Sequence, residues 1–112
     1  MQGVNGGGAQ DGEQVAHWVI QYADGTSREW PVIYGNQVRD WFFHEELPED
    51  ASHAVIAWKG HAPDDRGTMG GGKVRLFKAT WTNPVPEVEI RSLDFVLDTG
   101  NVCPFVVAIT AE

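Results

Sequence analysis

Apolar and polar positions alternate with a period of two from residue 15 onward, which is typical of β-strands rather than helices. In residues 15–22 (VAHWVIQY) the alternation places Trp18 on an apolar face. In residues 27–33 (SREWPVI) it places Trp30 on a corresponding face. The segment ADGT between them has the composition of a tight turn. The pattern therefore predicts a β-hairpin as the first regular unit.

The turn fixes the register of this hairpin. A three-residue loop of residues 23–25, with Gly25 in the left-handed conformation, places Trp18 opposite Trp30. A two-residue turn would place Trp18 opposite Pro31 and mix apolar with charged positions, so the three-residue register is favoured. Pro31 cannot donate to a ladder, and we expect it at an edge or a bulge.

Further short segments repeat the strand pattern, with turn residues every 8 to 12 positions, roughly as in antiparallel sandwiches. Residues 38–50 have the only helical character, and Pro48 limits this to one or two short helical turns. The expected fold class is all-β, an antiparallel β-sandwich. The additional strand candidates are residues 52–58, 74–81, 88–97 and 103–110.

Two prolines mark a corner in residues 79–95 (ATWTNPVPEVEIRSLDF). Pro84 and Pro86 have no amide proton, so the chain must leave the sheet after Trp81 and re-enter as the next strand. We expect the corner to carry the chain between two sheets, with the side chain of Asn83 bracing it.

The chain of 112 residues is long enough for one domain. Residues 1–14 contain many glycines and few apolar side chains, so we expect a flexible lead-in followed by a β-sandwich domain over residues 15–112. Cys103 is the single cysteine and lies in an apolar run, which favours a buried small hydrophobic residue and excludes an internal disulfide.

The net charge of −8 argues against nucleic acid and anionic membrane surfaces as partners. No stretch approaches the roughly 20 apolar residues of a membrane span. The compartment stays open from composition alone.

Catalytic and nucleotide motifs are weak. The segment Gly67–Lys73 (GTMGGGK) resembles a phosphate-binding loop, but Val74 replaces the required Ser or Thr and a strand pattern follows. The acidic cluster in residues 45–50 has the composition of a solvated face, and no serine nucleophile motif is present, so we expect no enzyme activity.

Metal binding has one candidate chemistry. The four histidines lack zinc-type spacing. We expect no cofactor, and calcium is the alternative. Asp64, Asp65 and Asp98 lie in turn-like loops and could supply the oxygen ligands that calcium prefers, although solvated turns explain the same residues.

Five tryptophans are many for so small a core. Trp18 and Trp30 are needed for packing, whereas Trp41 and Trp58 lie where loops begin. An aromatic face with polar neighbours can stack on the CH face of a sugar while polar groups bind its hydroxyls. The candidate ligand-binding residues are therefore Trp41, Trp58, Tyr34, Asn36, Arg39 and Asp40.

The segments YADGTSREWPVIYGNQVRDWF, VRLFKATWTNPVPEVEIRSLDFV and PFVVAIT together resemble the galactose-binding-like jelly-roll modules of multidomain bacterial proteins. The resemblance covers residues 15–110. It implies a non-catalytic carbohydrate-binding module that binds an oligosaccharide or polysaccharide as an accessory domain of a larger extracellular or periplasmic protein. The matching motifs are signatures of turns and corners, so the resemblance transfers no ligand-binding residue.

The alternative is a protein-interaction or structural module of a bacterial surface or regulatory protein. The resemblance to galactose-binding-like modules implies one or more further strands before the point where the pattern starts at Val15, because such modules usually carry them. We therefore expect an open sheet edge at the first hairpin, in the segment HWVIQY, and pairing of two such edges in a homodimer.

Overall fold

The computed structural model describes residues 1–6, 8–43, 51–61 and 72–111. Within these residues the chain forms strands and no helix, and so no helix that could cross a membrane. The strands are β1 (Gln2–Asn5), β2 (Gln14–Tyr22), β3 (Ser27–Ile33), β4 (Phe42–Phe43), β5 (Ala54–His61), β6 (Lys73–Ala79), β7 (Ile90–Leu97) and β8 (Cys103–Val106).

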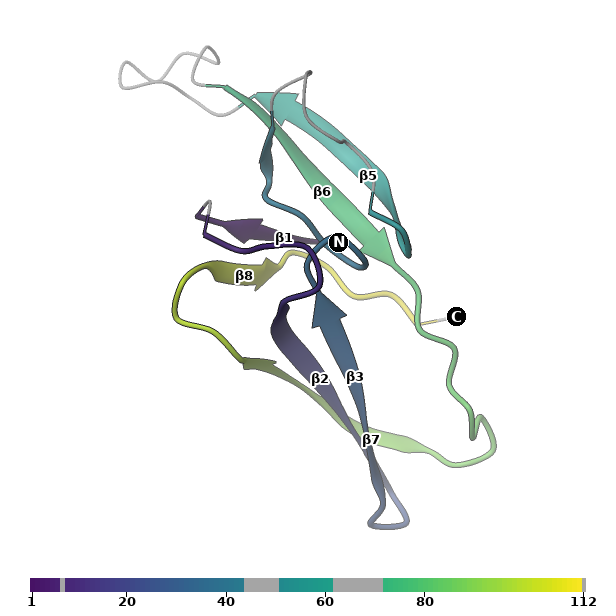
Figure 1. The fold of residues 1–112 in the computed structure, drawn as a ribbon. Coiled ribbons are helices and arrows are strands. Elements are labelled where there is room, and N and C mark those ends of the chain that lie inside the picture. Colours follow the sequence, from purple (N-terminus) through teal and green to yellow (C-terminus); the bar gives the residue numbers. More distant parts are fainter. Residues whose placement is uncertain (7, 44–50, 62–71, 112) are drawn as a thin grey trace.

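These strands form two antiparallel sheets, which confirms the expected all-β sandwich architecture. In the five-stranded sheet, β6 pairs with β4, β1 and β5, and β1 pairs in turn with β8. A three-stranded sheet has the order β3-β2-β7. In Figure 1, β5 and β6 lie in the upper part of the molecule, and β2, β3 and β7 in the lower part.

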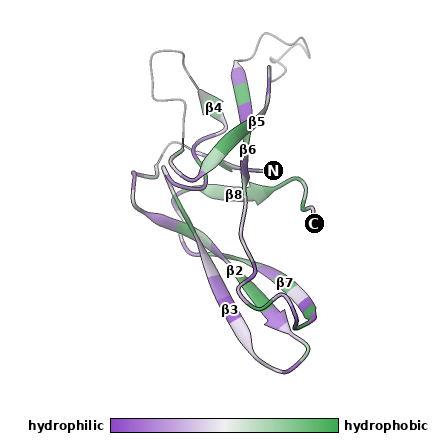
Figure 2. Ribbon diagram, turned by 90° about the vertical axis from the view of Figure 1, so that its right-hand side faces the viewer, coloured by the Kyte–Doolittle hydropathy of each residue, from purple (hydrophilic) through white to green (hydrophobic). Residues whose placement is uncertain are grey.

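One apolar core is shared by both sheets. Val4 of β1 and Phe77 of β6 are fully buried, as are Ile20 and Tyr22 of β2. Trp18 packs on Phe95 of β7 with ring centroids 4.9 Å apart. Apolar segments accordingly occur on strands of both sheets (Figure 2).

The first hairpin has the predicted register. Trp18 lies opposite Trp30, and the amide of Tyr22 donates to the carbonyl of Thr26. Gly25 has a φ of 89°, a conformation that glycine adopts without a Cβ penalty. Pro31 lies in β3, an edge strand, as the missing amide proton requires.

The proline corner connects the two sheets as expected. β6 belongs to the five-stranded sheet and β7 to the three-stranded sheet, so residues 80–89 cross between them. The Oδ1 atom of Asn83 accepts hydrogen bonds from the hydroxyl of Tyr22 at 2.7 Å and from the amide of Val85 at 3.1 Å. Asn83 thus ties the corner to the core.

The expectation that the whole lead-in is flexible was wrong for residues 2–5. They form β1, which lies between β6 and β8 inside the five-stranded sheet. Gln2, Gly3 and Val4 are buried. Pairing on both sides satisfies the backbone of this short segment, a non-local effect that composition does not reveal.

The segment HWVIQY does not form the predicted open edge, although β3 of the same hairpin is an edge strand. β2 pairs with β3 on one side and with β7 on the other, so it is the central strand of its sheet. The strand that covers it comes from the far end of the proline corner. β2 therefore has no open edge of its own.

Two local expectations differ from the structure. Cys103 is exposed because the next residue of β8, Pro104, takes the buried side of the strand. In the segment expected to have helical character, Phe42–Phe43 forms β4, and residues 44–50 lie outside the described part of the chain.

Replacing Asn83 with alanine should destabilise the domain. Asn83→Ala leaves the hydroxyl of Tyr22 and the amide of Val85 without their acceptor, at a cost of about 1–2 kcal/mol. Urea unfolding followed by tryptophan fluorescence measures this loss. The neighbouring exposed Thr82→Ala is the matched control, and equal stability of the two variants would contradict the bracing role.

Candidate functional site

The outer face of the five-stranded sheet carries exposed aromatic residues. Phe42 lies opposite Val74 and Trp58 lies opposite Leu76 in the two ladders that flank β6. Directly opposed residues share a face of the sheet, as do residues two apart on one strand. Phe77, which is in the core, points to the other face. Phe42 and Trp58 therefore share the face that points away from the core.

A β-bulge turns Trp58 outward. Ile56 lies opposite Phe77 on the core side, and the register then shifts so that Trp58 lies opposite Leu76. In a regular ladder Trp58 would share the face of Ile56, two residues before it. The extra residue, Ala57, sends it to the outer face, and bulges commonly re-aim a side chain in this way.

Trp41 extends the aromatic surface toward β8. Its ring centroid lies 4.9 Å from that of Phe42 and 5.6 Å from that of Phe105, with edge-on geometry in both pairs. Its indole Nε1 donates to Oδ1 of Asn5 at 3.3 Å. We call the four side chains Trp41, Phe42, Trp58 and Phe105 the outer aromatic face.

Two glycines let these rings lie close to the sheet. A Cβ atom on Gly3 would lie 2.7 Å from Cζ of Phe105, and one on Gly60 would overlap the ring of Trp58. Each ring thus fills the space that a side chain at the glycine position would need. Trp58 stays 46% exposed and Phe42 43% exposed. The two glycines thus let the rings pack against the sheet while aromatic surface remains exposed to solvent.

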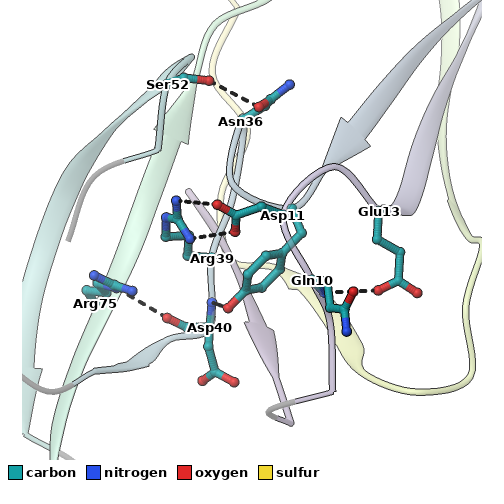
Figure 3. Close-up of polar contacts among 9 residues, drawn as sticks. Gln10, Asp11, Glu13, Asn36, Arg39, Asp40, Ser52 and Arg75 are labelled. Carbon is teal, nitrogen blue, oxygen red and sulfur yellow. Dashed lines mark hydrogen bonds and ion pairs between the residues drawn. The ribbon is translucent and has the colours of Figure 1, made fainter. Parts of the chain in front are cut away.

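The turn before β4 holds a separate polar network, shown in Figure 3. The guanidinium of Arg39 donates to both carboxylate oxygens of Asp11, at 2.8 and 3.1 Å. The hydroxyl of Ser52 donates to Oδ1 of Asn36 at 3.1 Å. These bonds tie residues 36–39 to the turn before β2 and to the segment before β5.

Asp40 links this network to the aromatic residues. Its amide donates to the hydroxyl of Tyr34 at 3.0 Å, and its carbonyl accepts from Nε of Arg75 at 3.2 Å. Its carboxylate accepts from the amide of Phe42 at 2.9 Å. Burial raises the pKa of Asp40, opposed by this hydrogen bond and by the charge of Arg75. Asp40 therefore positions the start of β4.

The structure divides the residues that the sequence singled out. Trp41 and Trp58 lie on the outer aromatic face, whereas Tyr34, Asn36, Arg39 and Asp40 belong to the polar network. Sequence reasoning missed Phe42 and Phe105. The alternation within residues 103–110 was the available signal for Phe105, while no local pattern identified Phe42 as an outward-facing strand residue.

Of the three calcium candidates, only Asp98 lies in the described part of the chain. Asp64 and Asp65 lie outside it. Asp98 accepts hydrogen bonds from Nε2 of Gln14 at 2.9 Å and from Nδ1 of His17 at 2.7 Å. Across residues 1–6, 8–43, 51–61 and 72–111, no group of three potential metal ligands forms.

No protein-family model, curated protein or solved structure matches this chain. Function must therefore be argued from the geometry of the outer aromatic face.

The pair of His17 and Asp98 predicts a pH-dependent stability. The hydrogen bond to Asp98 raises the pKa of His17 above its ordinary value of 6.5. Hydrogen bonds from Gln14 and then from His17 lower the pKa of Asp98. The protonated His17 stabilises the fold. This contribution is fully present below the pKa of His17 in the unfolded chain, and it is lost as the pH rises through the higher pKa in the folded chain. The carboxylate contributes above its unfolded pKa of 3.8 and loses this effect in acid.

The melting temperature should therefore fall as the pH rises from about 6.5 through the raised folded pKa of His17, and it should fall less in His17→Gln. Thermal melts of both proteins test this, together with NMR titration of the His17 ring. A titration midpoint at or below 6.5 would contradict the assignment.

Proposed function

We propose that the outer aromatic face binds glycan chains without catalysing a reaction on them. The observation that carries the proposal is the seating of Phe105 over Gly3 and of Trp58 over Gly60, with Trp58 and Phe42 both exposed on that face. The exposed rings of Trp58 and Phe42 offer apolar surface to a ligand. The apolar CH face of a pyranose matches such a surface.

The spacing of two aromatic positions on this face supports a chain of sugars as the ligand. One position is the cluster of Trp41, Phe42 and Phe105, and the other is Trp58 across β6. Two inter-strand spacings and two residues of strand rise separate Phe42 from Trp58 by roughly 10 to 12 Å. A linear oligosaccharide can contact both positions, whereas a single terminal sugar can contact only one.

Polar side chains border the aromatic residues. Asn5 is exposed, and its Oδ1 already orients the indole of Trp41, which leaves its amide group to donate to a sugar hydroxyl. Lys78 is exposed and lies two residues beyond Leu76, on the same face of β6. Hydrogen bonds from such groups fix the orientation of a ligand that stacking alone would leave free to slide.

The competing function is protein interaction. Val55 lies opposite Lys78 on the outer face and is 63% exposed, an apolar side chain that sugar stacking does not use. Exposed apolar surface of this kind is common at protein interfaces. A glycan site requires ring faces, and a protein interface requires apolar area of any shape, so side-chain replacements separate the two functions.

Trp58→Ala should abolish binding of a linear oligosaccharide and Trp58→Phe should retain part of it, because only phenylalanine keeps a flat ring. Tryptophan fluorescence titration and calorimetry against a panel of plant, algal and bacterial polysaccharides measure the response. Binding should be weak, with a dissociation constant in about the micromolar to millimolar range, because an open platform is wet and gains little beyond the cost of association.

Val55→Ala is the matched control, since it removes apolar area from the same strand and face without removing a ring. Unchanged glycan binding in this variant supports stacking. The glycan proposal fails if the native domain responds to no member of the panel, or if Val55→Ala and Trp58→Ala weaken binding equally.

A further inference from the structure

β7 is the least protected sheet edge in the described part of the chain. The edge strand β3 contains Pro31, and β5 contains both the bulge at Ala57 and a lysine, Lys59. β8 is four residues long and contains Pro104. β7 runs for eight residues without a proline or a lysine, and both are common devices against edge pairing.

The free backbone groups of β7 can be assigned from one hydrogen bond. The amide of Asp98 donates to the carbonyl of Val15 at 3.0 Å. Bonding residues alternate along an antiparallel ladder, so even-numbered residues of β7 bond to β2. The amide and carbonyl groups of Leu93, Phe95 and Leu97 therefore point away from β2, toward an open position beside the sheet.

Two of these residues, Leu93 and Leu97, are apolar side chains that the core does not fully cover. Leu93 lies opposite Ile20 and Leu97 lies opposite Ala16, which places both on the core side of the sheet. Even so, Leu93 is 41% exposed and Leu97 is 55% exposed. A strand added along β7 would satisfy the backbone groups and cover this apolar stripe together.

We infer that β7 pairs with β7 of a second copy of this chain, antiparallel about a two-fold axis at Phe95. In this register Leu93 lies opposite the second copy's Leu97, and Asp94 lies opposite its Val96. Arg91 and Ser92 meet Thr99 and Asp98, so the directly opposed pairs contain no like charges. Because apolar residues oppose apolar residues and no like charges meet, β7 of a second copy is a suitable strand to pair with this edge.

The neighbouring register is less favourable. With the axis at Asp94, two carboxylates lie directly opposite each other and Ile90 meets Asp98. Pairing at Phe95 joins the two three-stranded sheets into one, in which both outer edges are β3 strands carrying Pro31. The assembly therefore closes as a dimer instead of growing further. Because each chain has a net charge of −8, added salt should strengthen the dimer by screening repulsion.

Cysteine cross-linking tests the register directly. In a Cys103→Ser background, the double variant Asp94→Cys/Val96→Cys places cysteines at directly opposed positions that share no ladder hydrogen bond, where Cβ atoms are close enough for a disulfide. Mild oxidation should convert it to a covalent dimer. Asp94→Cys alone should stay monomeric on a denaturing gel, because it can cross-link only with the axis at Asp94. Efficient cross-linking of the single variant would overturn the proposed register.

Sedimentation equilibrium of the native chain tests the association itself without any change to the β7 edge. The native chain should show a dimer at high micromolar concentration, more strongly at 0.5 M than at about 0.05 M salt. Leu97→Glu should raise the dissociation constant about tenfold or more, and circular dichroism checks that it remains folded. A single species of 12.4 kDa for the native chain at both salt concentrations, or assemblies larger than a dimer, would overturn the inference.

Discussion

Burial of β6 on both of its faces is the constraint on which the rest of the structure depends. Residues 74–77 are all buried. Phe77 lies in the shared core. The Cζ atom of Arg75 lies 5.1 Å from the centroid of the Phe77 ring, and Nε of Arg75 donates to the carbonyl of Asp40. Val74 and Leu76 need cover on the other face. Phe42 and Trp58, directly opposite them, help to provide it, so the outer aromatic face exists first because the fold requires it.

Sequence reasoning succeeded where local chemistry decides the structure. The loop at Gly25 fixed the first hairpin, and the prolines with Asn83 fixed the crossing between sheets. It failed where partners lie far apart in the chain. β1 is four residues of ordinary composition whose order comes from β6 and β8, and the direction of Trp58 depends on a bulge that only strand pairing reveals. The polar roles of Asn36 and Arg39 likewise depend on partners elsewhere in the chain, Ser52 and Asp11.

The two proposed surfaces belong to different sheets. The outer aromatic face lies on the five-stranded sheet, and the β7 edge lies on the three-stranded sheet at the other end of the molecule (Figure 1). Pairing through β7 would leave the aromatic residues free in both copies. In such a dimer, two weak sites would bind a polymeric ligand more tightly than either alone, because the second contact becomes intramolecular. Modest affinity at a single site is then compatible with firm attachment to a polysaccharide.

The pairing of β1 with β8 has a consequence for how the chain acquires its structure. Gln2 meets Val106, about a hundred positions later, so this part of the sheet cannot close until nearly all of the described chain is available. Contacts of such long sequence separation slow folding, because loop entropy is lost before the contacts form. During synthesis the hairpin of β2 and β3 can form early, while β1 waits for its partner. Its exposed backbone in that interval is where chaperone binding or premature aggregation would begin.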